Sequence, residues 1–231
     1  MSKDQPLKQH ESAGAAGDSS IVDTKLYDSV GIKGMKTMTS GGVKQEIAEG
    51  PIKALDVPIG WSRSTEYTDP VGSLIKFSPG LGKSSLNSLE HQQPISPKAQ
   101  EAFSKLLEDN ANLTKPKMLT PDQIRSISEV LGDRHMGDNQ YTNKAPYPSP
   151  NSPLFKLTNA QLKSVNGHTV LEVEGSFMDQ NGKPTEFYQG ILSPNKNSGK
   201  INEFFLAAPD RDELIQHDHA YRKAVRSIEW R

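Results

Sequence analysis

Residues 168–192 decide the fold of this chain, and they read HTVLEVEGSFMDQNGKPTEFYQGIL. In the first half of this stretch apolar residues alternate with glutamates, which is typical of a strand with two different faces. Residues 179–182 then predict a hairpin turn, because the pair Asn181-Gly182 accepts the positive φ angles that tight turns need. Residues 186–192 return as a second strand, so the stretch predicts an antiparallel pair.

The residues that follow predict one more strand and one helix. Residues 201–207 form the strand, and a helix begins near Asp210 and ends near Ile228. Acidic residues open this helix and basic residues close it, in agreement with the helix dipole. Its apolar face comprises Leu214, Tyr221, Ala224, Val225 and Ile228. This helix is expected to lie across an antiparallel sheet.

Shorter elements are predicted upstream. Strands are expected over 54–58, 73–77 and 154–157, and order is expected to begin near Ile52. A helix is predicted over 96–109, with Ser96 as its N-cap and Pro97 in the first position. A second helix is predicted over about 121–131, where Thr120 and Gln123 form a capping box.

These elements predict an α+β fold, in which helices flank an antiparallel β-sheet as an α/β/α sandwich. Residues 1–50 are expected to be a polar and largely disordered tail, because they lack periodicity and contain several glycines. Residues 51–231 are expected to be a single domain, with a helical and Pro-rich insertion at about 90–153.

The composition excludes several classes of function. The 231 residues include 27 basic and 28 acidic ones, with no strongly basic block, so no nucleic-acid partner is expected. The absence of cysteine excludes disulfides, cysteine nucleophiles and thiolate metal sites. Apolar runs are too short for a membrane span, and the polar start is no Sec signal peptide. The protein is therefore expected in the cytoplasm or exported by another route, or in the periplasm if a signal peptide has been removed.

Two parts of the chain resemble the group of proteins that contains PsbP and the bacterial protein DcrB. The first is Leu55–Trp61 with the strand ending at Pro79, and the second is Asn166–Gly175 with the hairpin and strand up to Pro209. The resemblance covers roughly residues 52–80 and 154–231. It implies a sheet flanked by helices and a binding or assembly role, and it implies no shared catalytic residues.

Four motifs invite a chemical interpretation. Residues 80–85, GLGKSS, lack the first glycine of a phosphate-binding loop, so a plain turn is favoured. His217 and His219 are candidate metal ligands, although two residues apart on a helix they point to different faces. Glu172 and Glu174 share one face of a strand, which suits paired carboxylates, although a solvent-facing surface is the more common reason for such a pattern. Asp133, His135 and Asp138 form the fourth motif, in which a loop histidine between carboxylates could act as a base or a ligand.

The sequence therefore favours a non-enzymatic protein-binding, assembly or chaperone-like module that uses no cofactor and binds another protein. The alternative is a secreted effector or an enzyme, with a site on the 133–153 loop around His135, Asp133 and Asp138. His217 and His219 are the candidates for a metal site. The oligomeric state stays open.

Overall fold

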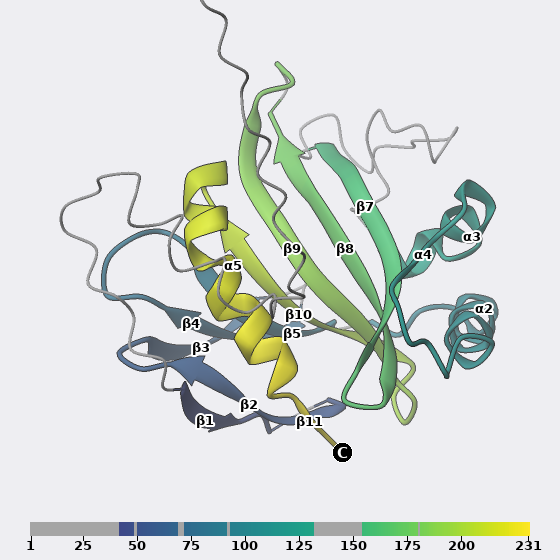
Figure 1. Cartoon of the computed structure of the whole chain (residues 1–231). Helices are drawn as coiled ribbons and strands as arrows, with labels where there is room; N and C mark the ends of the chain where they lie inside the picture. Colours follow the sequence, from purple (N-terminus) through teal and green to yellow (C-terminus); the bar gives the residue numbers. More distant parts are fainter. Residues whose placement is uncertain (1–41, 49, 69–71, 92, 132–153, 180) are drawn as a thin grey trace, which may run out of the picture. The chain divides into compact units, whose positions relative to one another are not determined.

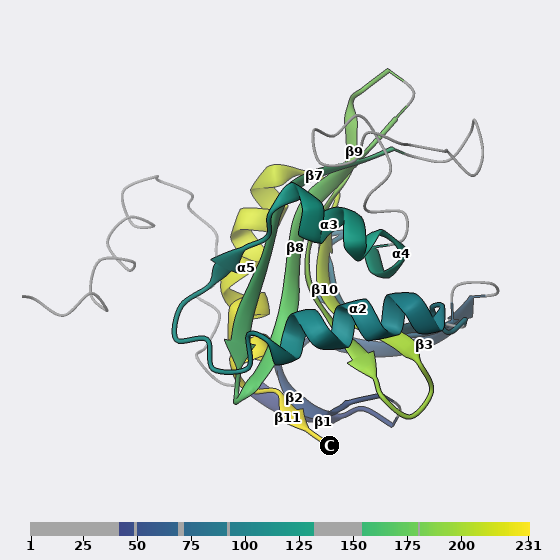
Figure 2. The same ribbon diagram turned by 90° about the vertical axis from the view of Figure 1, so that its right-hand side faces the viewer.

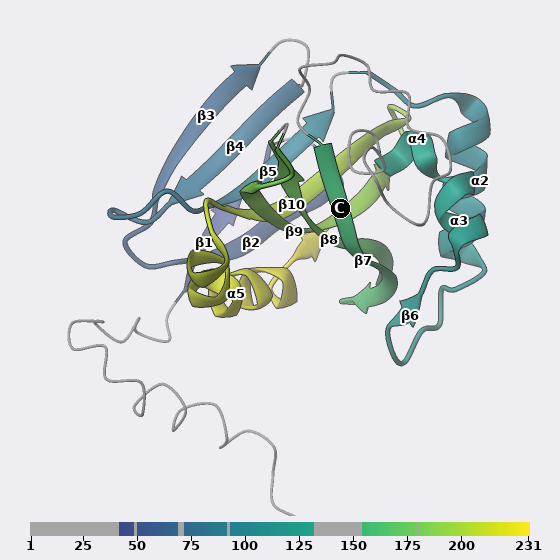
Figure 3. The same cartoon turned by 90° about the horizontal axis from the view of Figure 1, so that it is seen from above.

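The computed structural model describes residues 42–48, 50–68, 72–91, 93–131, 154–179 and 181–231. Its main feature is an eight-stranded antiparallel sheet with the strand order β3-β4-β5-β10-β9-β8-β7-β6. The strands of this sheet are β3 (Ser62–Thr68), β4 (Gly72–Ser78), β5 (Ser85–His91), β6 (Lys117–Met118), β7 (Leu154–Val165), β8 (His168–Met178), β9 (Pro184–Asn195) and β10 (Lys200–Ala208). Figure 3 shows β3 near one end of the sheet and β7 near the other.

Helices pack on both faces of the central strands. Helix α5 (Arg211–Arg226) crosses β9 and β10 on one face (Figure 1). Helices α2 (Pro97–Glu108), α3 (Pro121–Ser126) and α4 (Ser128–Leu131) lie on the opposite face (Figure 2). The predicted α+β class, with helices flanking an antiparallel sheet, is confirmed.

Each face of the sheet has its own hydrophobic core, and β8 contributes to both. Leu171 and Val173 pack with the residues of α2, α3 and α4, including Phe103 and Ile127. Val170 points to the other face and belongs to the core beneath α5. Because successive side chains of a strand alternate between faces, Glu172 and Glu174 also lie on the α5 face.

A second, three-stranded antiparallel sheet has the order β1-β2-β11 and packs into the core beneath α5. Its strands are β1 (Gly42–Glu46), β2 (Ile52–Pro58) and β11 (Glu229–Trp230). Strand β1 pairs along β2, so ordered structure begins before the expected position near Ile52. The expectation for residues 1–41 of the tail lies outside the described residues.

Local chemistry explains most of the observed boundaries. The hairpin between β8 and β9 is confirmed, with Gly182 at φ +75° and the Asp179 carboxylate accepting from the amides of Asn181 and Lys183. The Ser96 cap and the Thr120–Gln123 capping box are present.

One local prediction was wrong, and one central strand was not predicted. The helix predicted over 121–131 is two short helices, because the backbone leaves the helical conformation at Ile127 (φ −111°, ψ 21°). Residues 85–91, which follow the GLGKSS motif, form β5 and are central in the sheet. Their Ser and Asn residues hide the strand pattern.

Candidate functional site

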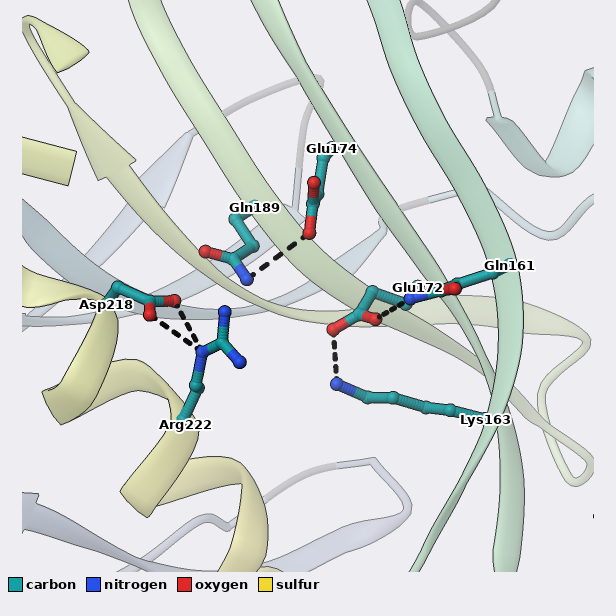
Figure 4. Close-up of polar contacts among 7 residues, drawn as sticks. All are labelled: Gln161, Lys163, Glu172, Glu174, Gln189, Asp218 and Arg222. Atoms are coloured by element: carbon teal, nitrogen blue, oxygen red, sulfur yellow. Dashed lines mark hydrogen bonds and ion pairs between the residues drawn. The ribbon is translucent and has the colours of Figure 1, made fainter. Parts of the chain in front are cut away.

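A group of charged and amide side chains lies on the α5 face of β7, β8 and β9 (Figure 4). We call it the β8–α5 cluster, and its members are Gln161, Lys163, Glu172, Glu174, Gln189, Asp218 and Arg222. Strand register brings the first five together, since Gln161 lies opposite Glu172 and Glu174 lies opposite Gln189. Asp218 and Arg222 come from α5, one helical turn apart.

Glu172 is the most buried member of the cluster, with 5% of its surface exposed. Lys163 Nζ forms an ion pair with one carboxylate oxygen, and Gln161 Nε2 donates to the other at 2.7 Å. The expectation of a solvent-facing Glu172 was therefore wrong. A buried carboxylate is tolerated here because both of its oxygens have strong donors.

Asp218 and Arg222 form an ion pair along α5. Arg222 Nε donates to both carboxylate oxygens of Asp218, at 2.9 and 2.7 Å. This hydrogen bond raises the pKa of Arg222 above its ordinary value, and the charges of Glu172 and Glu174 add to the effect. The side chain of Arg222 is 60% exposed, so this pair sits at the open margin of the cluster.

Glu174 differs from the other two carboxylates because its hydrogen-bond partners are amides. Gln189 Nε2 lies 3.5 Å from its Oε1, and Asn159, directly opposite on β7, supplies a further hydrogen bond. Burial raises the pKa of Glu174, and the charge of Glu172 raises it further, while Asn159 and the charge of Arg222 oppose the rise. Within the described ranges, no cation is within salt-bridge distance of Glu174.

Two polar atoms beside the cluster are buried without a hydrogen-bond partner among the described residues: Asn159 Oδ1 and the Tyr221 hydroxyl. Tyr221 lies on α5 between Asp218 and Arg222 and is fully buried, with Lys163 Nζ 6.0 Å from the centre of its ring. Burial raises the pKa of Tyr221, and the charge of Glu172 raises it further. Buried polar atoms usually have partners, so both atoms call for an explanation.

The structure does not bring the two candidate metal ligands His217 and His219 to one face of α5. Asp133, His135 and Asp138 lie outside the described residues, so the enzyme hypothesis stays a prediction. His217 is 5% exposed, its ring centre lies 5.3 Å from that of Trp61 in an edge-to-face arrangement, and burial lowers its pKa. His219 is exposed on a different side of α5. In the part of the chain that the structure describes, no three His, Cys, Asp or Glu side chains are placed to hold a metal ion.

The glycine-rich motif at residues 80–85 contacts a carboxylate of the chain itself. Glu213 Oε2 accepts from Ser84 Oγ at 2.6 Å, from Ser84 N at 3.2 Å and from Lys83 N at 3.4 Å. These contacts fix the first turn of α5 to the loop between β4 and β5. The motif therefore has a structural role in positioning the helix that carries Asp218 and Arg222.

A second polar group, not singled out in the sequence, lies on the other face of the sheet. The Glu203 carboxylate is fully buried, 2.5 Å from His91 Nε2, and it accepts from the Tyr188 hydroxyl at 3.0 Å. Because β5, β10 and β9 are neighbours, three distant parts of the sequence supply one residue each. No local motif could have predicted this arrangement.

The comparisons with known proteins give little beyond this geometry. No protein-family profile and no curated protein matches the chain. Among solved structures, it is similar to the crystal structure of LpqN, involved in cell envelope biogenesis of Mycobacterium tuberculosis. The identity is 14% and the TM-score is 0.35, over 82% of this chain and 90% of that one. This likeness carries no argument about function, and the PsbP/DcrB-like resemblance remains a prediction. Among the described helices, none has the length and apolar content to span a membrane.

Proposed function

We propose that this chain is a non-enzymatic protein-binding module and that the β8–α5 cluster is its contact surface. The observation that carries the proposal is a set of charged side chains of both signs where helix α5 faces the sheet, held by hydrogen bonds within the helix and by others among the strands. Charges fixed in this way give a protein surface selectivity for one partner, because a mismatched partner would leave them unpaired. The long paired strands β7, β8 and β9 supply the rigid support that a recognition site needs.

For Glu172 and Asp218, binding is a better explanation than catalysis. Glu172 accepts from Lys163 and Gln161, and the Asp218 carboxylate is engaged by Arg222. A general base needs a carboxylate whose lone pairs can reach a substrate proton, and these two are already occupied. Three carboxylates against two cations also leave the cluster acidic, which favours a basic protein surface over the phosphates of a nucleic acid.

The test is affinity capture from the lysate of the native host, with the full-length chain as bait and mass spectrometry as the readout. Arg222→Ala, at the exposed margin of the cluster, is expected to lose a stoichiometric partner that the parent retains. Arg211→Ala is the matched control, because Arg211 is an exposed arginine in the first turn of the same helix.

A charge-exchanged variant, Asp218→Arg with Arg222→Asp, sharpens the test. It keeps an ion pair along α5 and reverses the order of the two charges that the partner meets. Loss of the partner in this variant, with retention in Arg211→Ala, supports recognition by the cluster. If the parent and the three variants captured the partner equally, the proposed surface would be refuted. If the parent captured no protein, the proposed function would be refuted.

A further inference from the structure

The eight-stranded sheet ends at β3, and among the described residues no strand pairs with its outer side (Figure 3). Strand β3 pairs with β4 along all seven of its residues, in a regular antiparallel register that runs from Ser62 opposite Ser78 to Thr68 opposite Gly72. Its first four side chains, from Ser62 to Thr65, are exposed. A long and regular edge strand presents a row of backbone N–H and C=O groups with which another strand can pair.

The other strand edges within the described ranges carry features that discourage such pairing. Strand β6, at the opposite end of the same sheet, has two residues, and β7 beside it is irregular between Leu157 and Asn159. Strand β11 also has two residues, and β1 carries the exposed Lys44 at its centre. Short strands, bulges and lysines are common protections of a sheet edge. Strand β3 is longer and contains no proline, glycine or lysine.

The positive charge of β3 is held by the chain itself. Arg63 Nη1 donates to the backbone oxygen of Glu46 in β1 at 3.0 Å. The same guanidinium lies 5.9 Å from the centre of the Phe77 ring, and Phe77 belongs to β4, on the inner side of β3. Arg63 is therefore drawn over the body of the sheet and leaves the outer side of β3 open to another strand.

We propose that the outer edge of β3 pairs with β3 of a second copy of this chain, antiparallel and with the two copies of Thr65 opposite each other. Two copies joined in this way form one continuous antiparallel sheet. The inference goes beyond the proposed function and does not depend on it, because four strands separate β3 from β8 in the sheet.

The register of this pair follows from the sequence of β3. In an antiparallel pair related by a two-fold axis, opposite side chains lie on the same face, which requires that one residue lies opposite its own copy. Only Thr65, the middle residue, lets all seven positions pair. Arg63 and Glu66 then each face an uncharged residue, whereas a pair centred on Glu66 would set two glutamates against each other. Strand β3 is therefore complementary to itself in length and in charge.

The first experiment measures the mass of the full chain in solution. Seven paired residues make a small interface, so the dimer is expected to be weak, with a Kd on the order of 10–100 µM. Sedimentation equilibrium at concentrations from below to well above this range is expected to show the mass rising from the 25.4 kDa of the monomer toward twice that value. A constant monomer mass at every concentration would overturn the proposal and leave the edge to another occupant.

The second experiment tests the register with single cysteines, because the chain has none of its own. Opposite residues of an antiparallel pair lie about 4.5–5.5 Å apart, so Thr65→Cys is expected to form a disulfide-linked dimer on mild oxidation. The two copies of Ser62 would lie about 20 Å apart, so Ser62→Cys, on the same exposed strand, is expected to stay largely monomeric. Thr114→Cys, exposed in the loop after α2, measures random collision. Equal rates of dimer formation in the three variants would overturn the proposal.

The third experiment uses charge and needs no disulfide. Thr65→Lys and Thr65→Glu each place two like charges opposite each other, so each variant alone is expected to sediment as a monomer. An equimolar mixture of the two is expected to dimerise, because opposite charges then face each other. Thr65 is exposed, so circular dichroism is expected to show both variants folded like the parent. Self-association of either variant alone as strong as that of the parent, or a mixture that stays monomeric, would overturn the pairing about Thr65.

Discussion

The two buried tyrosines of this fold lead to a prediction with opposite signs for the same substitution. Tyr221 and Tyr188 are 0% and 1% exposed. The Tyr221 hydroxyl has no hydrogen-bond partner among the described residues, whereas the Tyr188 hydroxyl donates to the buried Glu203 carboxylate at 3.0 Å. Tyr221→Phe is expected to stabilise the isolated chain, and Tyr188→Phe is expected to destabilise it.

The magnitudes follow from what each hydroxyl loses on burial. An unpartnered buried hydroxyl costs about 1–3 kcal/mol, so its removal should raise the free energy of unfolding by about 1 kcal/mol after the lost packing is included. For a chain of this size that corresponds to an increase of about 2–4 °C in Tm. Tyr188→Phe removes a hydrogen bond to a buried charged group, which is worth about 1.5–3 kcal/mol. The two variants should therefore differ by about 3 kcal/mol.

Urea denaturation of both variants and the parent at neutral pH, followed by circular dichroism, measures these differences. The slopes of the unfolding transitions should match, so that the midpoints report stability alone. If Tyr221→Phe destabilised the chain by as much as Tyr188→Phe, the Tyr221 hydroxyl would have a partner.

Three further predictions concern the interior. The free energy of unfolding should fall as the pH drops from about 6.5 to the lowered folded-state pKa of His217, because the native state favours the neutral imidazole. Urea denaturation at several pH values in this range should show a smaller change in the free energy of unfolding for His217→Gln than for the parent. Lys163→Met should lower the free energy of unfolding at neutral pH by about 3 kcal/mol, because it leaves Glu172 buried without its cation. In urea denaturation, the double variant Lys163→Met with Glu172→Gln should recover most of this loss. Gly175→Ala should lower the free energy of unfolding by about 3 kcal/mol, because the new Cβ would lie 2.5 Å from a backbone oxygen of β7. Gly80→Ala is the control: nothing lies within 4 Å of its Cβ, so its thermal unfolding should match that of the parent.

Elements with strong local signals could be predicted from the sequence. The Asn181-Gly182 turn, the Ser96 cap and the Thr120–Gln123 capping box each act within a few residues, and all three are present as predicted. The class of the fold followed from these elements and from the amphipathic C-terminal helix. Strand β5 could not be predicted, because its Ser and Asn residues gain their strand conformation from pairing with β4 and β10 on either side.

The candidate site was harder to predict because its members meet only through long-range pairing. Lys163 and Glu172 are joined across the β7–β8 hairpin, and Arg222 arrives from a helix fifty residues later in the chain. His91, Tyr188 and Glu203 meet in the same way on the other face. No spacing within a single element records such contacts.

The alternation of Glu172 and Glu174 with apolar residues shows the physical limit most directly. Alternation reports that the two faces of a strand differ, and it does not report what lies over the polar face. On an open sheet both glutamates would face water and would need no partner. Here α5 runs beside them, so burial forces each carboxylate to find donors. Glu172 finds Lys163 and Gln161, whereas Glu174 finds only amides. The same sequence pattern therefore yields one carboxylate paired with a cation and one that, among the described residues, is held by amides, and only the packing of α5 and β7 decides which is which.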